Sequence, residues 1–322
     1  MGAALPGFAQ ALGDGIVAID TGFHRPGFDA AYLIVDDGRA AFFDTGTNFA
    51  LPRLLATLDA LGLPRSAVDW VIPSHVHLDH AGGAGALMRE LPAARLLVHP
   101  RGLKHLVDPG ALYDGALAVY GAEAMARDYG RLVPVDAARA AATEDGQTIR
   151  LGQRTLEFAH TPGHARHHHC LWDARSRSWF TGDTFGLSYR EFDTARGAWM
   201  MVSSTPVQFD PPALAASVRR LLAQQPRWVQ LTHFGRIGDL ERTGPALLAA
   251  IDAMAEIGRS TAGGDGRHER LRDALRAWYL RGARAHGCTL PEAAVVDLLT
   301  LDIELNAQGI GIWRDRVERA AR

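Results

Sequence analysis

The sequence predicts an α/β fold, because short apolar strands alternate with helices along most of the chain. Residues 68–74 (VDWVIPS) and 94–100 (ARLLVHP) are apolar runs that end at or next to proline, as interior strands do. Between them, residues 82–91 (GGAGALMREL) have the length and apolar spacing of a helix. The order strand, helix, strand is the basis of the prediction.

Other segments extend this pattern. Residues 28–35 and 40–46 predict two strands joined at 36–39 (DDGR), because an Asp-Gly pair tolerates the positive φ of a tight turn. The remaining predicted elements are a helix over 111–129, a strand pair within 146–164, a hairpin within 168–183, a helix over 210–226 and a strand over 228–235. Beyond residue 240 the pattern predicts helices alone, over 245–258, 270–287 and 291–309. We therefore expect a catalytic domain over 1–240 and a helical region over 241–322 packed on it.

Composition narrows the classes of function. The formal net charge of −2 gives no electrostatic reason for binding nucleic acid or an anionic membrane, and it argues against a phosphate-gripping nuclease. Two cysteines, Cys170 and Cys288, cannot build a disulfide framework and suit a reducing compartment. The first 15 residues lack the basic segment of a signal peptide, so we expect a cytoplasmic protein without nucleic-acid or membrane partners.

Histidines are concentrated in one part of the chain, since ten of 14 lie between residues 75 and 169. The segment 71–83 (VIPSHVHLDHAGG) holds His75, His77, Asp79 and His80 directly after a predicted strand. In an extended backbone His75 and His77 point to the same side and can bind one ion, while Asp79 and His80 can turn toward a second. Imidazole with carboxylate suits zinc, iron or manganese, and the residues alone leave that choice open.

One short loop rarely completes a metal site, so later segments must contribute ligands. His164 lies in HTPGHA, Asp183 in FTGDTFG and His233 in LTHFG, each just past a predicted strand. Residues at strand ends of a layered fold can gather at one rim of the sheet. These three residues are therefore candidate partners for the 75–80 cluster.

The ordered motifs HVHLDH, TPGH, TGD and TH resemble the metallo-β-lactamase superfamily over roughly residues 15–240, in its dinuclear branch that includes glyoxalase II and lactonases. The resemblance implies a four-layer αββα sandwich, here with a helical C-terminal extension, and two divalent metal ions. Zinc is favoured, with iron or manganese as alternatives. The implied ligands are His75, His77 and His164 for the first metal, Asp79, His80 and His233 for the second, and Asp183 bridging both.

The resemblance further implies a metallo-hydrolase in which a hydroxide bridging the two ions attacks a small ester, lactone or thioester. Asp79 could also pass a proton to the leaving group. The stretch 185–210 is rich in aromatic residues and methionine, which suggests an apolar substrate pocket or a loop packed on the C-terminal helices. Tyr189 is a candidate hydrogen-bond donor to an oxyanion. Lactonases of this superfamily often have tyrosine three residues after the bridging aspartate, where this chain has Gly186.

Several alternatives stay open at this point. The same ligand set could serve an iron-dependent oxidoreductase that oxidises thiols or binds dioxygen, or a regulatory binding protein without turnover. Asp44 either supports the metal site or caps a turn. We expect the histidines at 167–169 to be supporting or surface residues, and His99 and His160 to be structural. The C-terminal helices could roof the pocket or pair two subunits as a homodimer.

Overall fold

The computed structural model describes residues 4–204 and 207–321. The chain forms two compact units. The first unit comprises residues 1–160, 167–182 and 226–236, and the second comprises 161–166, 183–225 and 237–322. The second unit contains the expected helical region, residues 241–322, together with two segments from the middle of the chain.

Two sheets form the centre of the first unit. Among the described residues, one sheet has seven strands in sequence order: β1 (Ala9–Gly13), β2 (Ile16–Asp20), β3 (Ala30–Asp36), β4 (Arg39–Phe43), β5 (Val68–Ile72), β6 (Arg95–Val98) and β7 (Ala140–Ala142). Its first four strands are antiparallel, and β4 to β7 run parallel. The other sheet has the order β13 (Gly235–Ile237), β12 (Trp228–Leu231), β11 (Ser178–Gly182), β10 (His169–Asp173), β9 (Arg154–His160) and β8 (Thr148–Leu151).

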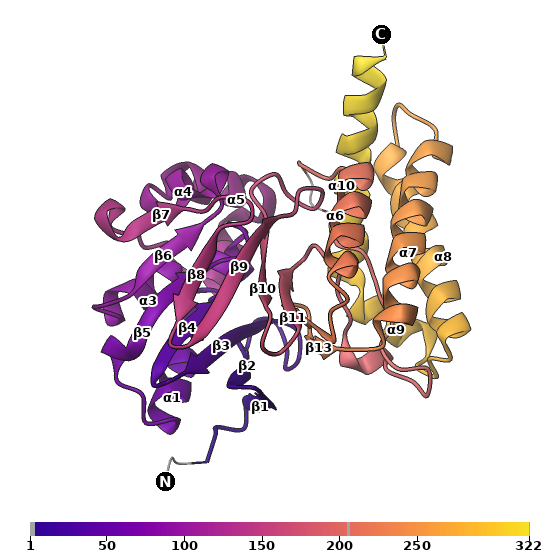
Figure 1. The fold of residues 1–322 in the computed structure, drawn as a ribbon. Helices are drawn as coiled ribbons and strands as arrows, with labels where there is room; N and C mark the ends of the chain where they lie inside the picture. Colours follow the sequence, from indigo (N-terminus) through magenta and orange to yellow (C-terminus); the bar gives the residue numbers. More distant parts are fainter. Residues whose placement is uncertain (1–3, 205–206, 322) are drawn as a thin grey trace. The chain divides into compact units, whose positions relative to one another are not determined.

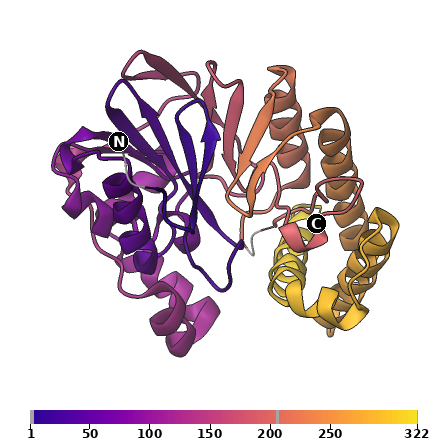
Figure 2. The ribbon, with the colours of Figure 1, turned by 90° about the horizontal axis from the view of Figure 1, so that it is seen from below.

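The two faces of the seven-stranded sheet are covered differently. Tyr32 and Phe43 on one face pack with Phe158 and Phe180 of the other sheet in a fully buried layer. The opposite face is covered by helices α1 (Leu51–Ala60), α3 (Ala84–Glu90) and α4 (Pro100–Val107), as Figures 1 and 2 show. Such apolar burial contributes about 25 cal/mol per Å² of surface removed from water, so these two layers hold the sheets together.

The predicted elements of this unit are present. The β3–β4 hairpin turns at Asp37 and Gly38, whose φ values of 48° and 72° are the positive ones that the DDGR sequence predicts. The sequence analysis did not include β1, β2, β7, β13, α1, α4 or the single turn α2 (Leu78–Ala81). The helix expected over 111–129 is interrupted: α5 (Gly110–Ala124) has a kink at Gly121, where φ is 80°, and a π-helical turn, Met125–Tyr129, follows it.

The second unit is helical, with α6 (Pro211–Ala223), α7 (Leu240–Ser260), α8 (Arg267–His286), α9 (Glu292–Leu298) and α10 (Thr300–Ala320). Asp210 begins α6 by accepting a hydrogen bond from Ala213 N at 3.2 Å, and prolines fill the first turn. The single helix expected over 291–309 is wrong, because the chain breaks at Leu299. The Leu299 side chain is fully buried, and the break lets α9 and α10 each contact α8.

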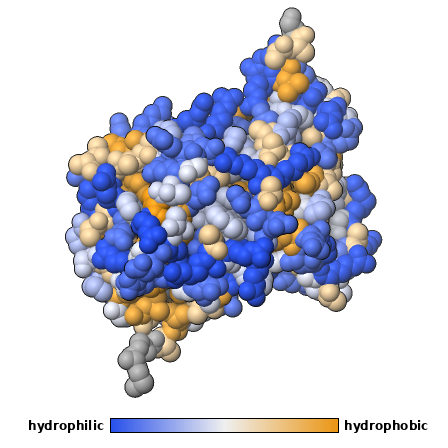
Figure 3. Space-filling view, in the orientation of Figure 1, coloured by the Kyte–Doolittle hydropathy of each residue, from blue (hydrophilic) through white to orange (hydrophobic). Residues whose placement is uncertain are grey.

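The predicted class, an α/β fold of two sheets with a helical C-terminal region, is confirmed. In the part of the chain that the structure describes, we find no helix that is both long and apolar enough to span a bilayer. The molecular face in Figure 3 is mostly hydrophilic, with small hydrophobic areas between the charged side chains. Scattered apolar exposure of this kind is usual on protein surfaces.

Candidate metal centre

The histidine-rich segment forms a tight connection between β5 and α3. The chain leaves β5 at Ile72, His77 precedes the single turn α2, and that turn carries Asp79 and His80. Gly83 then lies so close to the loop after β4 that a Cβ on it would be 2.8 Å from the Thr47 carbonyl oxygen. The glycine is therefore required for the turn to pack against that loop.

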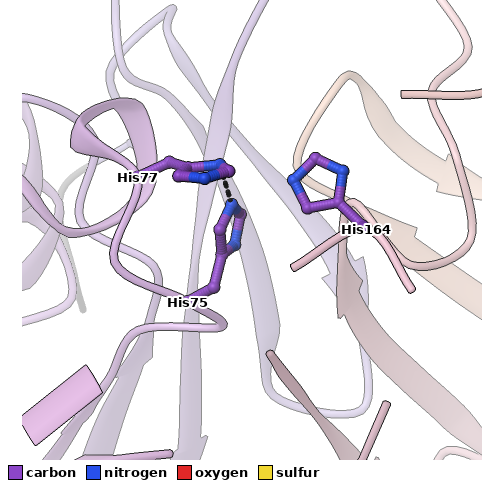
Figure 4. A group of neighbouring side chains, drawn as sticks. All are labelled: His75, His77 and His164. Atoms are coloured by element: carbon purple, nitrogen blue, oxygen red, sulfur yellow. Dashed lines mark hydrogen bonds between the residues drawn. The ribbon is translucent and has the colours of Figure 1, made fainter. Parts of the chain in front are cut away.

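The side chains of His75 and His77 lie next to each other, although residues 74–76 form bends and not the extended backbone that the prediction assumed. Nε2 of His75 lies 2.6 Å from Nδ1 of His77, and Figure 4 shows the two rings edge to face. The same figure includes His164, which belongs to the second unit. His75 is fully buried, and its Nδ1 lies 3.0 Å from the Ser74 hydroxyl. Two imidazole nitrogens at this separation are a donor set suited to one transition-metal ion.

Asp79, His80 and His233 form a second group in the first unit. Their ligand atoms all lie within 4.8 Å of one another. Oδ2 of Asp79 is 3.7 Å from Nε2 of His80 and 3.4 Å from Nε2 of His233. His233 follows β12, and its Nδ1 lies 3.0 Å from the carbonyl oxygen of Phe28. The chain thus brings a carboxylate and two imidazoles together from segments more than 150 residues apart.

Asp44 is a buried residue with several polar partners in this unit. Its carboxylate is fully buried and accepts hydrogen bonds from the Ser74 amide at 2.6 Å and from the Thr232 hydroxyl at 2.6 Å. It also lies 2.9 Å from Nδ1 of His80. A proton held on Nδ1 leaves the Nε2 lone pair of His80 facing Asp79, the arrangement typical of metal-ligating histidine. Of the two interpretations of Asp44, support of the site fits these contacts and turn capping does not.

His164 and Asp183 lie together in the second unit. Nε2 of His164 is 3.3 Å from Oδ2 of Asp183, and both side chains are buried. Ser203 contacts both residues, because its carbonyl oxygen lies 3.0 Å from His164 Nδ1 and its hydroxyl donates to Asp183 Oδ2 at 3.0 Å. The sequence analysis did not identify Ser203.

The strands that precede His164 and Asp183 in the chain belong to the first unit. Asp183 directly follows Gly182, the last residue of β11. A Cβ on Gly182 would lie 2.4 Å from the Ser74 hydroxyl, so β11 ends against the residue that precedes His75. His164 follows the end of β9 by four residues. The two strands that lead to His164 and Asp183 therefore belong to the sheet of the first unit.

The aromatic stretch 185–210 packs within the second unit. Phe185, Phe192 and Met201 are fully buried, and the Trp199 ring lies 5.2 Å from Phe192. The Tyr189 hydroxyl donates to the Asp302 carboxylate of α10, with oxygen distances of 3.1 and 3.3 Å. Residues 205 and 206 of this stretch lie outside the described residues. These contacts match packing on the C-terminal helices; a substrate contact of Tyr189 stays a prediction.

The three histidines at 167–169 are buried, so a surface position for them is wrong. His169 begins β10, and its two ring nitrogens each lie 2.9 Å from an oxygen, on Thr143 and on Pro73. The His168 ring stacks on His75 at 4.8 Å, which fits a supporting role. His99 and His160 contact each other, with ring centroids 4.3 Å apart.

Asp29 is a buried acid near this centre that the sequence analysis did not single out. Burial raises the pKa of Asp29 to about 7, while the nearby His233 opposes that rise. Its Oδ2 accepts a hydrogen bond from the Thr21 hydroxyl at 2.8 Å. The sequence feature that could have identified Asp29 is its position, as an aspartate at the start of an otherwise apolar strand.

Comparison with known proteins agrees with this geometry. A family model described as the metallo-beta-lactamase superfamily matches residues 24–234. The hydroxyacylglutathione hydrolase of Acidiphilium cryptum is 30% identical over 268 residues, which cover 79% of this chain and 86% of that protein. The acyl-coenzyme A thioesterase MBLAC2 of Bos taurus is 29% identical, over 54% of this chain and 64% of that protein.

A solved structure shows the same fold. The superfamily protein ST1585 of Sulfolobus tokodaii superposes with a TM-score of 0.64, covering 92% of this chain and 98% of that chain at 20% sequence identity. The matched family model spans the segments that carry the clustered histidines and aspartates. This chain belongs to the metallo-beta-lactamase superfamily.

Proposed function

We propose that this chain is a metal-dependent hydrolase that cleaves a small ester, lactone or thioester. The observation that carries the proposal is a repeated orientation of imidazole rings. In three histidines Nδ1 is held by an oxygen and Nε2 is directed at a carboxylate: His80 and His233 at Asp79, and His164 at Asp183. Fixed tautomers that present lone pairs beside carboxylates fit a transition-metal donor set.

The proposed ligand assignment follows these groups. His75, His77 and His164 would hold one ion, Asp79, His80 and His233 a second, and Asp183 would contact both. Zinc is our first choice of metal, with iron or manganese as alternatives, because the donors mix imidazole with carboxylate. When bound, such ions supply hydroxide at neutral pH and polarise the carbonyl of the substrate.

The residues of the chain then perform the remaining tasks. Asp44 keeps His80 in one tautomer, and Ser203 orients both His164 and Asp183. Asp79 would take the proton that a water molecule loses when it becomes hydroxide. As the new acyl–oxygen bond forms and the bond to the leaving oxygen or sulfur breaks, Asp79 would pass that proton to the leaving atom. Asp79 suits this role because its side chain is partly exposed, whereas Asp44 is fully buried.

The relatives support the acyl-transfer class without fixing the substrate. By name, one is a hydroxyacylglutathione hydrolase and the other an acyl-coenzyme A thioesterase. We therefore place thioesters and oxygen esters before other bonds. A cytoplasmic location, a homodimer and an apolar group on the substrate remain expectations from the sequence.

The test combines metal analysis with a substrate panel. Protein purified without added metal is expected to hold about two divalent ions per chain and to hydrolyse at least one of the esters, lactones and thioesters offered. His77→Ala should lose metal and reduce turnover by at least about 1,000-fold. His268→Ala is the matched control, because His268 pairs with Glu304 at 3.0 Å on the helical surface.

Two results would overturn the proposal. Uniformly background rates with bound metal would favour a regulatory binding protein. Background rates with bound iron and measurable oxygen uptake would favour the oxidoreductase alternative.

A further inference from the structure

The C-terminal helix α10 holds the segment that carries Ser203, within the second unit. Ser203 itself contacts both proposed ligands of this unit, because its carbonyl oxygen lies 3.0 Å from His164 Nδ1 and its hydroxyl donates to Asp183 Oδ2 at 3.0 Å. The backbone groups of the residues on either side of Ser203 are hydrogen-bonded to Asn306 of α10. The position of Ser203 therefore depends on a side chain more than 100 residues later in the chain.

The Asn306 side chain makes every hydrogen bond that an amide group offers. Its Oδ1 accepts from the backbone N–H and from the hydroxyl of Ser204, each at 2.7 Å. Its Nδ2 donates to the carbonyl oxygen of Val202 at 3.2 Å and to the Tyr279 hydroxyl of α8 at 2.7 Å. An amide side chain has two acceptor sites and two donor hydrogens, so all of them are used here.

The contacts to the backbone require an amide at position 306. A backbone N–H can only donate and a carbonyl oxygen can only accept, so Ser204 and Val202 determine which amide atom is oxygen and which is nitrogen. Asn306, Ser204 and Val202 are each no more than 2% exposed, so these bonds are shielded from water. A buried polar group that loses its partner is destabilised, which makes asparagine difficult to replace at this position.

The buried face of α10 makes a second polar contact with the same stretch of chain. Asp302 lies four residues before Asn306, on the same face of the helix, and both side chains are buried. Asp302 accepts a hydrogen bond from the Tyr189 hydroxyl at 3.1 Å. The helix thus holds residues 185–204 at two points, and the contact made by Asn306 is the one next to Ser203.

We propose that Asn306 is a positioning residue of the candidate metal centre, because it fixes the backbone on both sides of Ser203. Through Ser203 it keeps His164 and Asp183 in the orientations that bind an ion. This inference rests on the proposed function of the same site. The Ser203 carbonyl oxygen can only accept, so it selects the His164 tautomer with hydrogen on Nδ1 and leaves the Nε2 lone pair for an ion. The C-terminal region thereby takes part in metal binding.

Two single-residue variants each remove one hydrogen bond from this amide. Asn306→Asp keeps the oxygen that faces Ser204 but places a second acceptor opposite the Val202 carbonyl oxygen, so that backbone bond is lost. Tyr279→Phe removes the other acceptor of the Asn306 amide hydrogens and leaves both backbone bonds in place. Both variants should lower the melting temperature, but only Asn306→Asp should change the metal centre.

The first readout is the zinc Kd of the full chain, measured by competition with a chelator. We expect Asn306→Asp to weaken at least one zinc-binding step by about 10- to 100-fold, the usual effect of disturbing the partners of a metal ligand. Tyr279→Phe should stay within about twofold of the wild type, because the partners of the ligands are unchanged. A merely structural role of Asn306 predicts instead that the two variants weaken zinc binding equally at equal loss of stability.

The second readout needs no metal. ¹⁵N NMR of the metal-free chain at about pH 9, where imidazole is neutral, reports which ring nitrogen of His164 carries the hydrogen. His164→Gln identifies the signals of this residue. The wild type and Tyr279→Phe should have the hydrogen on Nδ1, whereas Asn306→Asp should give a mixture of the two tautomers.

The results separate this inference from the proposed function. Asn306→Ala, which adds no charge, replaces Asn306→Asp if that variant does not fold, with the same expected results. Wild-type zinc affinity in the Asn306 variant would overturn the inference, as would an unchanged His164 tautomer or an equal loss of zinc affinity in Tyr279→Phe. A wild type that binds no zinc, but whose His164 tautomer depends on Asn306, would overturn only the proposed function.

Discussion

The protein has two aromatic clusters that look alike in composition and differ in their contacts. In the first unit, Phe28 lies beside His233, and the rings of Phe23, Tyr129 and Tyr120 follow it. In the second unit, Phe192 packs on Trp199, whose ring meets Tyr279 of α8 at 6.2 Å. The first cluster touches a candidate metal ligand, while the second touches other core residues. An aromatic residue that closely follows a metal motif in the sequence, such as Phe192, therefore need not lie beside a candidate ligand.

The tyrosines of the two clusters also differ in their contacts. The Tyr189 hydroxyl is engaged by the buried Asp302 carboxylate. Tyr120 in the first unit lies beside another tyrosine, with its ring centroid 5.2 Å from that of Tyr129. We accordingly expect mutations in the second cluster to change stability and to leave metal content unchanged.

The largest expected effect is that of Phe192→Ala. Phe192 is fully buried, so its truncation should lower the free energy of unfolding by about 3–5 kcal/mol. Metal content per chain should not change at temperatures where the variant is folded. Urea denaturation and metal analysis measure the two quantities. Phe49→Ala, at a side chain that is 56% exposed, should stay within about 0.5 kcal/mol of wild type. A loss of metal in Phe192→Ala would remove the contrast between the clusters.

The second prediction concerns pH and the first unit. Burial lowers the pKa of His169 to about 3, against an ordinary value of 6.5. Between these values the unfolded chain binds one more proton than the folded chain, so stability is complete above pH 6.5 and falls as the pH decreases. The slope is about 1.4 kcal/mol per pH unit for one proton. His99, whose pKa burial lowers to about 4, adds to the same slope.

Denaturant titrations of metal-free protein at pH 7, 6 and 5 measure this slope. His169→Gln, which cannot titrate, should reduce it by about one proton relative to wild type. An unchanged slope in the variant would mean that other groups in the first unit dominate acid unfolding.

The smallest expected effect is that of Tyr189→Phe. Removing one hydroxyl leaves the Asp302 carboxylate with one donor fewer, which should cost about 1–2 kcal/mol of unfolding free energy. Because Tyr189 packs in the second cluster, kcat/KM for 4-nitrophenyl butyrate should change less than twofold. A tenfold fall at unchanged stability would instead favour Tyr189 as an oxyanion donor.

Much of the fold could be predicted because its signals are local. The Asp37-Gly38 turn requires positive φ, and the prolines at the start of α6 mark a helix N-terminus. The break at Leu299 could not be predicted in this way, since residues 291–309 are compatible with one helix and the break follows from packing on α8. Local periodicity carries no information about a partner helix.

Some residues of the candidate site could likewise be predicted from the sequence, and others could not. The clustered histidines could be recognised because lone-pair donors at fixed spacing are unusual outside metal sites. Ser203, Asp29 and the contact of Phe28 with His233 were missed, because single polar or aromatic residues far apart in sequence carry no shared pattern. Their relation to the site appears only when the chain has folded.

Asp44 has a consequence for how such a protein can evolve. One carboxylate joins the ends of three strands, through Phe43 before it in the chain, Ser74 after β5 and Thr232 after β12. Any exchange at this position would alter the position of the proposed ligand His80 and the junction of the three strands at the same time. Selection for a new metal preference would therefore have more freedom at Asp79, on the partly open rim, than at this buried junction.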